Sequence, residues 1–254
     1  MKPADIIRMK DLLPTSLGSE EIREQIAADI IRRSVFSARM LSAAYLAKVR
    51  EVSEAIADGT INAADARARL LNILEQMGHS PLDDGGLQNP ASIRRLKLIL
   101  DTQTQMAASV ARLSEQTDAT LHQWPAWQLT RLEPRAVPRE DWPARWRAAG
   151  ASVAWEGALQ DRFIALKGSP IWQALGDGVG GYKDTLGNPY PPFAYSSGMD
   201  WVEVDRETCE KLGLMDGYRY EAKGTSRPTL SPGDREIADA IARYGFPDIG
   251  EDLA

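Results

Sequence analysis

The residues that could do chemistry in this 254-residue chain are few and scattered. There are two histidines, His79 and His122, and one cysteine, Cys209. The histidines lack the HxxxH or HExxH spacing that places two metal ligands on one helix face, and no histidine lies near Cys209 in sequence. We interpret the histidines as surface or capping residues and Cys209 as a structural thiol. We therefore expect no catalytic, cofactor-binding or metal-binding residues, and we expect that the protein is not an enzyme.

A glycine-rich stretch, residues 176–181, superficially resembles a phosphate-binding loop. Known phosphate loops lie between a strand and a helix, whereas further loop follows here, so these glycines are expected to provide flexible backbone. Asp177, Asp184 and Asn188 could offer oxygens to a hard cation, but their spacing is not that of a calcium loop. One alternative stays open: a small hydrolase or transferase that uses Asp177, Asp184 or Glu203 around this loop.

Charge and composition bear on the remaining function classes. The formal net charge of −6 repels a phosphate backbone at long range. A nucleic-acid-binding module using Arg94, Arg95 and Lys97 is nevertheless a second alternative. No apolar run approaches the roughly 20 residues that cross a bilayer, and the N-terminal residues do not read as a secretion signal. A single cysteine suits a reducing compartment, so we expect the chain to fold in a cytoplasm.

The most distinctive stretch is residues 188–199, where three prolines fix an extended backbone and three aromatic rings offer large apolar area. Two interpretations are open. The aromatic side chains could pack back onto their own domain, or they could anchor a partner subunit, because rigid segments lose little entropy on docking. The partner-contact candidates are Trp172, Tyr190, Pro191, Pro192, Phe193, Met199 and Trp201.

The first half of the chain has helical patterning. Ser19 is a possible N-cap of a long helix that ends at Asp58 and Gly59, with apolar residues from Ile22 to Ile56 spaced as a buried stripe. Asn62 is a possible N-cap of a second helix ending at Gly78, and Pro90 fits the first turn of a third helix whose apolar face runs from Ile93 to Leu113. We expect a helical hairpin or bundle over residues 19–122.

The second half has shorter elements and a different composition, since all seven tryptophans lie between Trp124 and Trp201. We expect strands at 128–132 and 163–166, a loop at 176–192, and short helices at 138–150, 205–212 and 234–244. The predicted fold class is α+β: an N-terminal long-helix hairpin or bundle followed by a small mixed α/β unit rich in loops. The predicted domains are a helical domain (1–123), a Trp/Pro-rich unit (124–215) and a polar C-terminal tail (216–254).

The order of motifs from residue 90 to residue 215 resembles the phage head-morphogenesis proteins, the minor capsid family similar to phage Mu protein F. The resemblance is carried by the Thr/Gln-rich helix at 101–107 and by the tryptophan-containing segments that follow it. Those segments are 127–131, 139–142 with Trp146, 162–167, 169–172, 190–193 with 197–199, and 204–209.

The resemblance implies a minor head protein, found in a phage or prophage, that acts without catalysis in building the phage head. It implies contacts with portal, capsid or scaffold proteins, with no membrane and with nucleic acid only by proximity to packaged DNA. It places the protein in the bacterial host cytoplasm during assembly and in the virion head. Many relatives have closely spaced cysteines after the Pro-Pro pair, where this chain has Ser196, Ser197 and Gly198, so a metal or disulfide there is not carried over.

Overall fold

The structure is a computed structural model, and it describes residues 1–81, 86–134, 139–155 and 162–215. Helices and strands are both present, so the fold class is α+β. The chain divides into two compact units, with the first running from Met1 to Ser114 and the second beginning at Glu115. The predicted helix at 234–244 lies outside the described residues.

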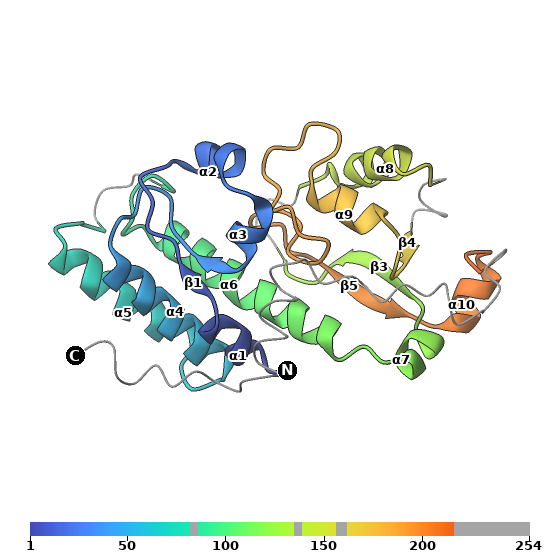
Figure 1. The fold of residues 1–254 in the computed structure, drawn as a ribbon, viewed down its shortest axis with the longest axis horizontal. Coiled ribbons are helices and arrows are strands. Elements are labelled where there is room, and N and C mark those ends of the chain that lie inside the picture. The colour runs from blue at the N-terminus through green and yellow to red at the C-terminus, as the bar shows by residue number, and fades with distance from the viewer. Residues whose placement is uncertain (82–85, 135–138, 156–161, 216–254) are drawn as a thin grey trace. The chain divides into compact units, whose positions relative to one another are not determined.

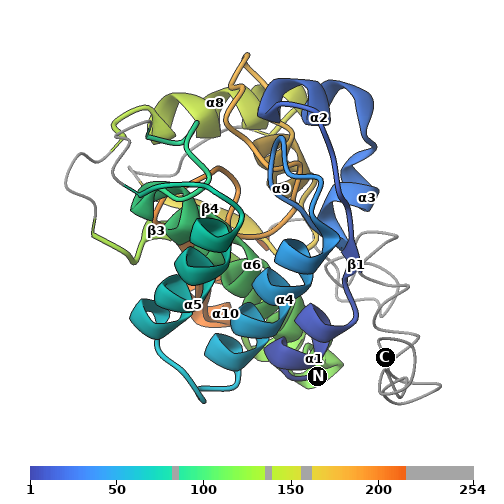
Figure 2. The same cartoon turned by 90° about the vertical axis from the view of Figure 1, so that its left-hand side faces the viewer.

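Four helices form the core of the first unit. They are α1 (Pro3–Arg8), α4 (Ala43–Ala57), α5 (Ala63–Gln76) and α6 (Ile93–Ser114). Helix α4 packs against the other three, and α1 also contacts α6, as Figures 1 and 2 show. The interior between them is aliphatic, with Leu46, Val49 and Leu70 fully buried and Tyr45 the one buried aromatic ring in this cluster.

Shorter elements precede α4. They are β1 (Asp11–Leu12), α2 (Ser19–Gln25), α3 (Ala28–Arg32) and β2 (Ser34–Val35). The prediction of one long helix from Ser19 to Ala57 is therefore wrong. Strand β2 pairs in parallel with β1, and Arg39 has a left-handed backbone with φ of 56°. Tertiary pairing overrides local helical periodicity, and Ile30, expected in the buried stripe, is exposed.

The ends of the later helices follow the sequence signals. The Asn62 side chain accepts hydrogen bonds from the backbone N–H groups of Ala64 and Asp65, as expected of an N-cap. Gly59 and Gly78 follow α4 and α5 with positive φ, the conformation that glycine adopts at the end of a helix. Helix α6 begins at Ile93 and ends at Ser114, so it contains the predicted apolar face from Ile93 to Leu113 but begins after Pro90.

The second unit is a three-stranded antiparallel sheet with helices. Its elements are α7 (Asp118–Gln123), β3 (Ala126–Arg131), α8 (Trp142–Ser152), β4 (Phe163–Leu166), α9 (Ile171–Gly176), β5 (Met199–Val204) and α10 (Arg206–Lys211). The strand order is β4-β3-β5. Strand β4 matches the prediction, whereas β5 and α9 were not predicted.

Side chains alternate between the two faces of this sheet. Trp127, Leu129 and their strand partners Ala165, Phe163 and Trp201 share one face, which α8 and α9 cover (Figure 1). The opposite face holds Ala126, Ile164 and Val204, against which Cys209 of α10 packs. The two faces thus have separate cores.

Among the described residues, no helix combines the length with the apolarity that a membrane crossing requires.

Candidate functional site

An aromatic cluster fills the covered side of the sheet in the second unit. The rings of Trp127 and Trp201 stack with centroids 3.8 Å apart. Trp172 meets the ring of Trp127 edge-on at 5.8 Å and that of Trp146 at 5.3 Å. Phe193 lies 6.0 Å from Trp172. Offset and edge-to-face pairs of this kind add to the stabilisation that comes from burying the rings.

All seven predicted partner-contact residues are buried. The exposed fractions are 2% for Trp172, 0% for Tyr190 and Phe193, 8% for Met199 and 4% for Trp201, and Pro191 and Pro192 are buried as well. The ring contacts of Trp172, Phe193 and Trp201 are with one another, with Trp127 and, for Trp172, with Trp146. Of the two interpretations that the sequence left open, the burial supports the one in which these aromatic side chains pack onto their own domain.

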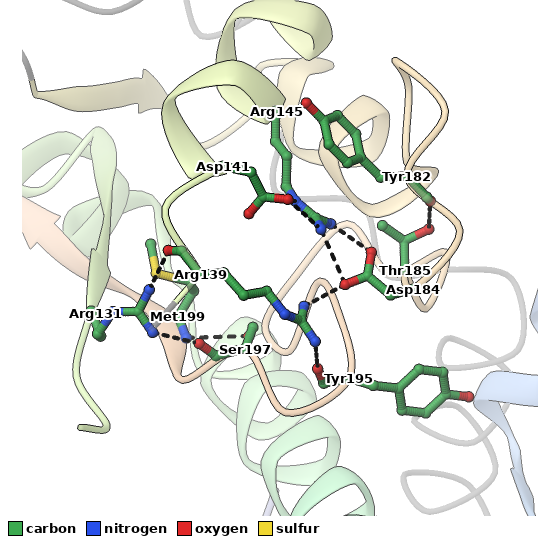
Figure 3. A network of polar contacts seen from close by, with 10 residues as sticks. All are labelled: Arg131, Arg139, Asp141, Arg145, Tyr182, Asp184, Thr185, Tyr195, Ser197 and Met199. Atoms are coloured by element: carbon green, nitrogen blue, oxygen red, sulfur yellow. Dashed lines mark hydrogen bonds and ion pairs between the residues drawn. The ribbon is translucent and has the colours of Figure 1, made fainter. Parts of the chain in front are cut away.

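A charged network lies beside the aromatic cluster and is centred on Arg145 of α8 (Figure 3). The Arg145 guanidinium donates to both carboxylate oxygens of Asp184, at 2.7 and 3.1 Å, and to Asp141 at 2.9 Å. It also lies 4.2 Å from the ring centroid of Tyr182 and 5.0 Å from that of Trp142. A bidentate ion pair with cation–π contacts holds this side chain in one geometry.

Asp184 is shared between two arginines, because Arg139 also forms an ion pair with it. Arg139 further donates to the carbonyl oxygen of Tyr195 at 2.6 Å, and Arg131 donates to those of Ser197 and Arg139. Burial alone would raise the pKa of Asp184, but the two guanidinium groups outweigh it and hold the pKa below its ordinary value. Figure 3 shows how these contacts join the loop at 182–197 to the start of α8 and the end of β3.

A second polar cluster lies around Lys167, directly after β4. Its side chain is 2% exposed, and its ammonium group contacts Glu203 of β5 at 2.7 Å and Gln116 at 2.7 Å. The same ammonium lies 5.3 Å from the Trp127 ring, and the Trp127 indole N–H donates to Glu203 at 3.2 Å. Burial lowers the pKa of Lys167, and Glu203 opposes that shift. The cluster ties three separate parts of the unit together.

The three carboxylates proposed for an enzyme do not converge in one place. Asp184 belongs to the arginine network and Glu203 to the lysine cluster, while the exposed Asp177 accepts from Gln173 at 2.6 Å. Among the described residues, no three His, Cys, Asp or Glu side chains gather as a metal-binding group. Cys209 is fully buried, and burial raises the pKa of its thiol to about 11.

Of the three residues proposed for a nucleic-acid surface, one is buried and two are exposed. Arg95 is 7% exposed, and its guanidinium donates to the Ser37 hydroxyl and to the carbonyl oxygens of residues 38, 87 and 88. Lys97 forms an ion pair with Asp101. Arg94 is exposed on the first turn of α6. Lys97 is exposed as well, so two of the three residues remain at the surface and one of these is paired with an acidic side chain.

The sequence suggested that the glycine-rich loop supplies flexible backbone, but Gly176 and Gly178 lie in close contact with neighbouring residues. A β-carbon on Gly176 would lie 1.8 Å from the carbonyl oxygen of Asn188, and one on Gly178 would lie 2.3 Å from that of Tyr182. Gly178, Gly180 and Gly181 all have positive φ. Gly176 and Gly178 permit a close approach of backbone to backbone and so fix the loop that carries Asp184.

Sequence reasoning missed the arginines and the lysine that organise this unit. Asp141 and Arg145 have the i,i+4 spacing of a helix-surface ion pair, a signal that could have marked Arg145. The pairing of Arg145 with Asp184, and of Lys167 with Glu203, joins residues more than thirty positions apart and has no local signature.

No family model, curated protein or solved structure matches this chain in any of the three comparisons made.

Proposed function

We propose that this chain is a phage or prophage minor head protein that acts in head assembly through protein–protein contacts. Its partners would be the portal protein and capsid or scaffold components, in the bacterial host cytoplasm and then in the virion head. The order of motifs over residues 90–215 supports this proposal, since it resembles the head-morphogenesis family. Contact with nucleic acid would follow only from proximity to packaged DNA.

The observation that carries the proposal is that Asp184 and Glu203 of the second unit form ion pairs with cationic side chains. Asp184 is bound by two guanidinium groups and Glu203 by a buried ammonium, and each pairing joins separate loops or strands. A general base must be free to take a proton, and a carboxylate with a lowered pKa between two arginines is poorly suited to that task. These groups hold a scaffold together, which favours a structural role over the hydrolase or transferase alternative.

Because the seven partner-contact candidates are buried, we place the docking surface on exposed residues elsewhere in the chain. The buried aromatic side chains would shape the second unit from within. The helical first unit, predicted from the sequence as a hairpin or bundle, would offer a docking surface of its own. It carries large exposed apolar side chains near the starts of α4 and α6 and the end of α5, at Leu41, Met77, Leu87 and Ile93.

Co-expression with the portal protein of the same phage or prophage, followed by a pull-down through a tag on this chain, tests the proposal. We expect retention of the portal protein, and weaker retention by Leu41→Asp and Ile93→Asp, whose side chains are each 69% exposed. Thr60→Asp, in the exposed turn between α4 and α5, is the matched control. No association at any salt concentration would overturn the proposed function.

A further inference from the structure

Two segments of the first unit are joined by one buried cation. The first segment, residues 36–44, leads into α4, and the second, residues 86–96, leads into α6. The Arg95 guanidinium, which is 7% exposed, donates to the Ser37 hydroxyl at 2.7 Å and to backbone carbonyl oxygens of both segments. These hydrogen bonds hold the two segments against each other.

Both segments expose apolar side chains. Leu41 and Ile93 are each 69% exposed and Leu87 is 53% exposed, the largest values among the large hydrophobic side chains described in the first unit. Ala43 and Ala44, on the first turn of α4, are exposed as well. Because Arg95 holds the two segments together, we group these side chains as one surface, the junction surface. An apolar surface that is open to water is typical of a binding site.

The charged residues of the two segments are all arginines, Arg39, Arg94 and Arg95. Arg39 and Arg94 are exposed, and Glu21 approaches Arg39 at Gly18. Within the described chain, the acceptors of the Arg95 guanidinium are hydroxyl and carbonyl oxygens, none of them a carboxylate. Burial lowers the pKa of Arg95, and the charge of Arg39 lowers it further. The junction surface is therefore cationic, although the chain has a net charge of −6.

We propose that the junction surface binds an acidic amphipathic segment of a partner protein. The apolar side chains of the partner would pack on Leu41, Leu87 and Ile93, with its carboxylates toward Arg39 and Arg94. A partner that covers the surface excludes water, which strengthens the attraction between carboxylates and guanidinium groups. The inference rests on the proposed function, since it takes this part of the first unit as a docking surface, and it states the chemistry of the partner.

Binding of three labelled helical peptides to the full chain, measured by fluorescence anisotropy, tests the proposal. The first peptide consists of leucine and glutamate, the second has lysine at every glutamate position, and the third has serine at every leucine position. We expect the leucine–glutamate peptide to bind at least about tenfold more tightly than either of the others. The net charge of −6 by itself favours the lysine peptide, so a preference for glutamate must come from local charge.

Substitutions on the junction surface should weaken binding of the leucine–glutamate peptide. We expect about a fivefold loss for Arg94→Glu, and less than about twofold for Arg112→Glu, at an exposed position about 27 Å farther along α6. Leu41→Ser combined with Ile93→Ser removes apolar area without adding charge and should cost about tenfold. Circular dichroism of each variant checks that the helices are intact.

Several outcomes would overturn the proposal. These are no binding of the leucine–glutamate peptide, equal or tighter binding of the lysine peptide, and equal effects of Arg94→Glu and Arg112→Glu. Displacement of the peptide by a DNA duplex would assign the surface to nucleic acid instead. A concentration-dependent dimer that Leu41→Ser with Ile93→Ser abolishes would assign it to a second copy of the chain.

Peptide binding requires no portal protein, so the two proposals fail separately. A chain that prefers the leucine–glutamate peptide but does not retain the portal protein would contradict the proposed function alone. A chain that retains the portal protein but shows no such preference would contradict this inference alone.

Discussion

The two units of this chain achieve stability by different chemistry. The first buries aliphatic side chains between helices, with the single ring of Tyr45 among them, and its buried Arg95 bonds a hydroxyl and backbone carbonyl oxygens. The second buries a cluster of tryptophans and pairs its buried cations Arg145 and Lys167 with carboxylates that are distant in sequence. Among its described residues, the second unit combines three short strands with four short helices, and the loop at 182–197 is held to them by directional contacts between specific side chains.

This difference implies that the second unit is the more sensitive to single substitutions of polar or small residues. Nonspecific apolar packing tolerates changes that keep volume, whereas a shared ion pair or a close backbone approach does not. All seven tryptophans lie in the second unit, so their fluorescence reports its unfolding separately from the helical signal.

The largest effect is expected for Gly176→Ala. Its β-carbon would lie 1.8 Å from the carbonyl oxygen of Asn188, a clash with backbone that cannot move without breaking the loop. We expect a loss above about 4 kcal/mol and an unfolded second unit, measured by tryptophan fluorescence. Gly181→Ala is the control: it has open space and only the strain of its φ of 91°, about 1–2 kcal/mol. Equal stability of the two variants would contradict the idea that the Asn188 carbonyl oxygen excludes a β-carbon at residue 176.

Core truncations in each unit come next. Trp146→Ala, at the fully buried centre of the aromatic cluster, should cost about 3–5 kcal/mol, and Leu70→Ala in the first unit about 2–5 kcal/mol. Hydrogen exchange, followed by mass spectrometry, should show each loss of protection mainly in the unit that carries the substitution. Protection lost equally across both units would mean that the two cores unfold as one.

Asp184→Asn removes the charge that Arg139 and Arg145 share. Because the Asp184 side chain is 34% exposed, we expect a loss of about 2 kcal/mol, below that of a fully buried pair. The folded pKa of Asp184 is lowered, so its contribution is present above the unfolded value of about 3.9 and is lost as pH falls through the folded value. Urea unfolding at several pH values should show wild type and variant converging in acid. A difference that grows in acid would contradict the ion-pair account.

The counterpart in the first unit is Arg95→Met. It leaves the carbonyl oxygens of Leu87 and Gln88 without their guanidinium donor and should cost about 2 kcal/mol in helical unfolding followed by circular dichroism. The neighbouring Arg94→Met, at an exposed position, should change stability by less than about 0.5 kcal/mol. Similar values for the two variants would show that the buried guanidinium does not hold these loops.

The smallest effect is expected at the start of α5. Asn62→Ala removes the side chain that accepts from the N–H groups of Ala64 and Asp65, at a cost of about 1 kcal/mol. Asn72→Ala, exposed inside the same helix, should be neutral or slightly stabilising. Thermal unfolding of the pair by circular dichroism measures the difference, and an equal midpoint would mean that the cap contributes nothing.

The sequence predicted those parts of the fold whose causes are local. The cap at Asn62, the glycine ends of α4 and α5 and the strand at 163–166 all depend on neighbouring residues. The helix expected from Ser19 failed because the pairing of β2 with β1 is a tertiary contact. For the same reason the roles of Asp184 and Lys167 were missed, since their partners are distant in sequence. The aromatic segment was singled out correctly as unusual, but its composition could not decide between inward packing and an exposed anchor.

The central claim is that the charged groups of the second unit hold a scaffold that acts by contact. Its most direct test is portal retention by the wild type and by Asp184→Asn, at a temperature where fluorescence shows both to be folded. We predict that both retain the portal protein within about a twofold difference in affinity, a gap of about 0.4 kcal/mol. Loss of retention in the folded variant, or no retention by the wild type, would contradict the account.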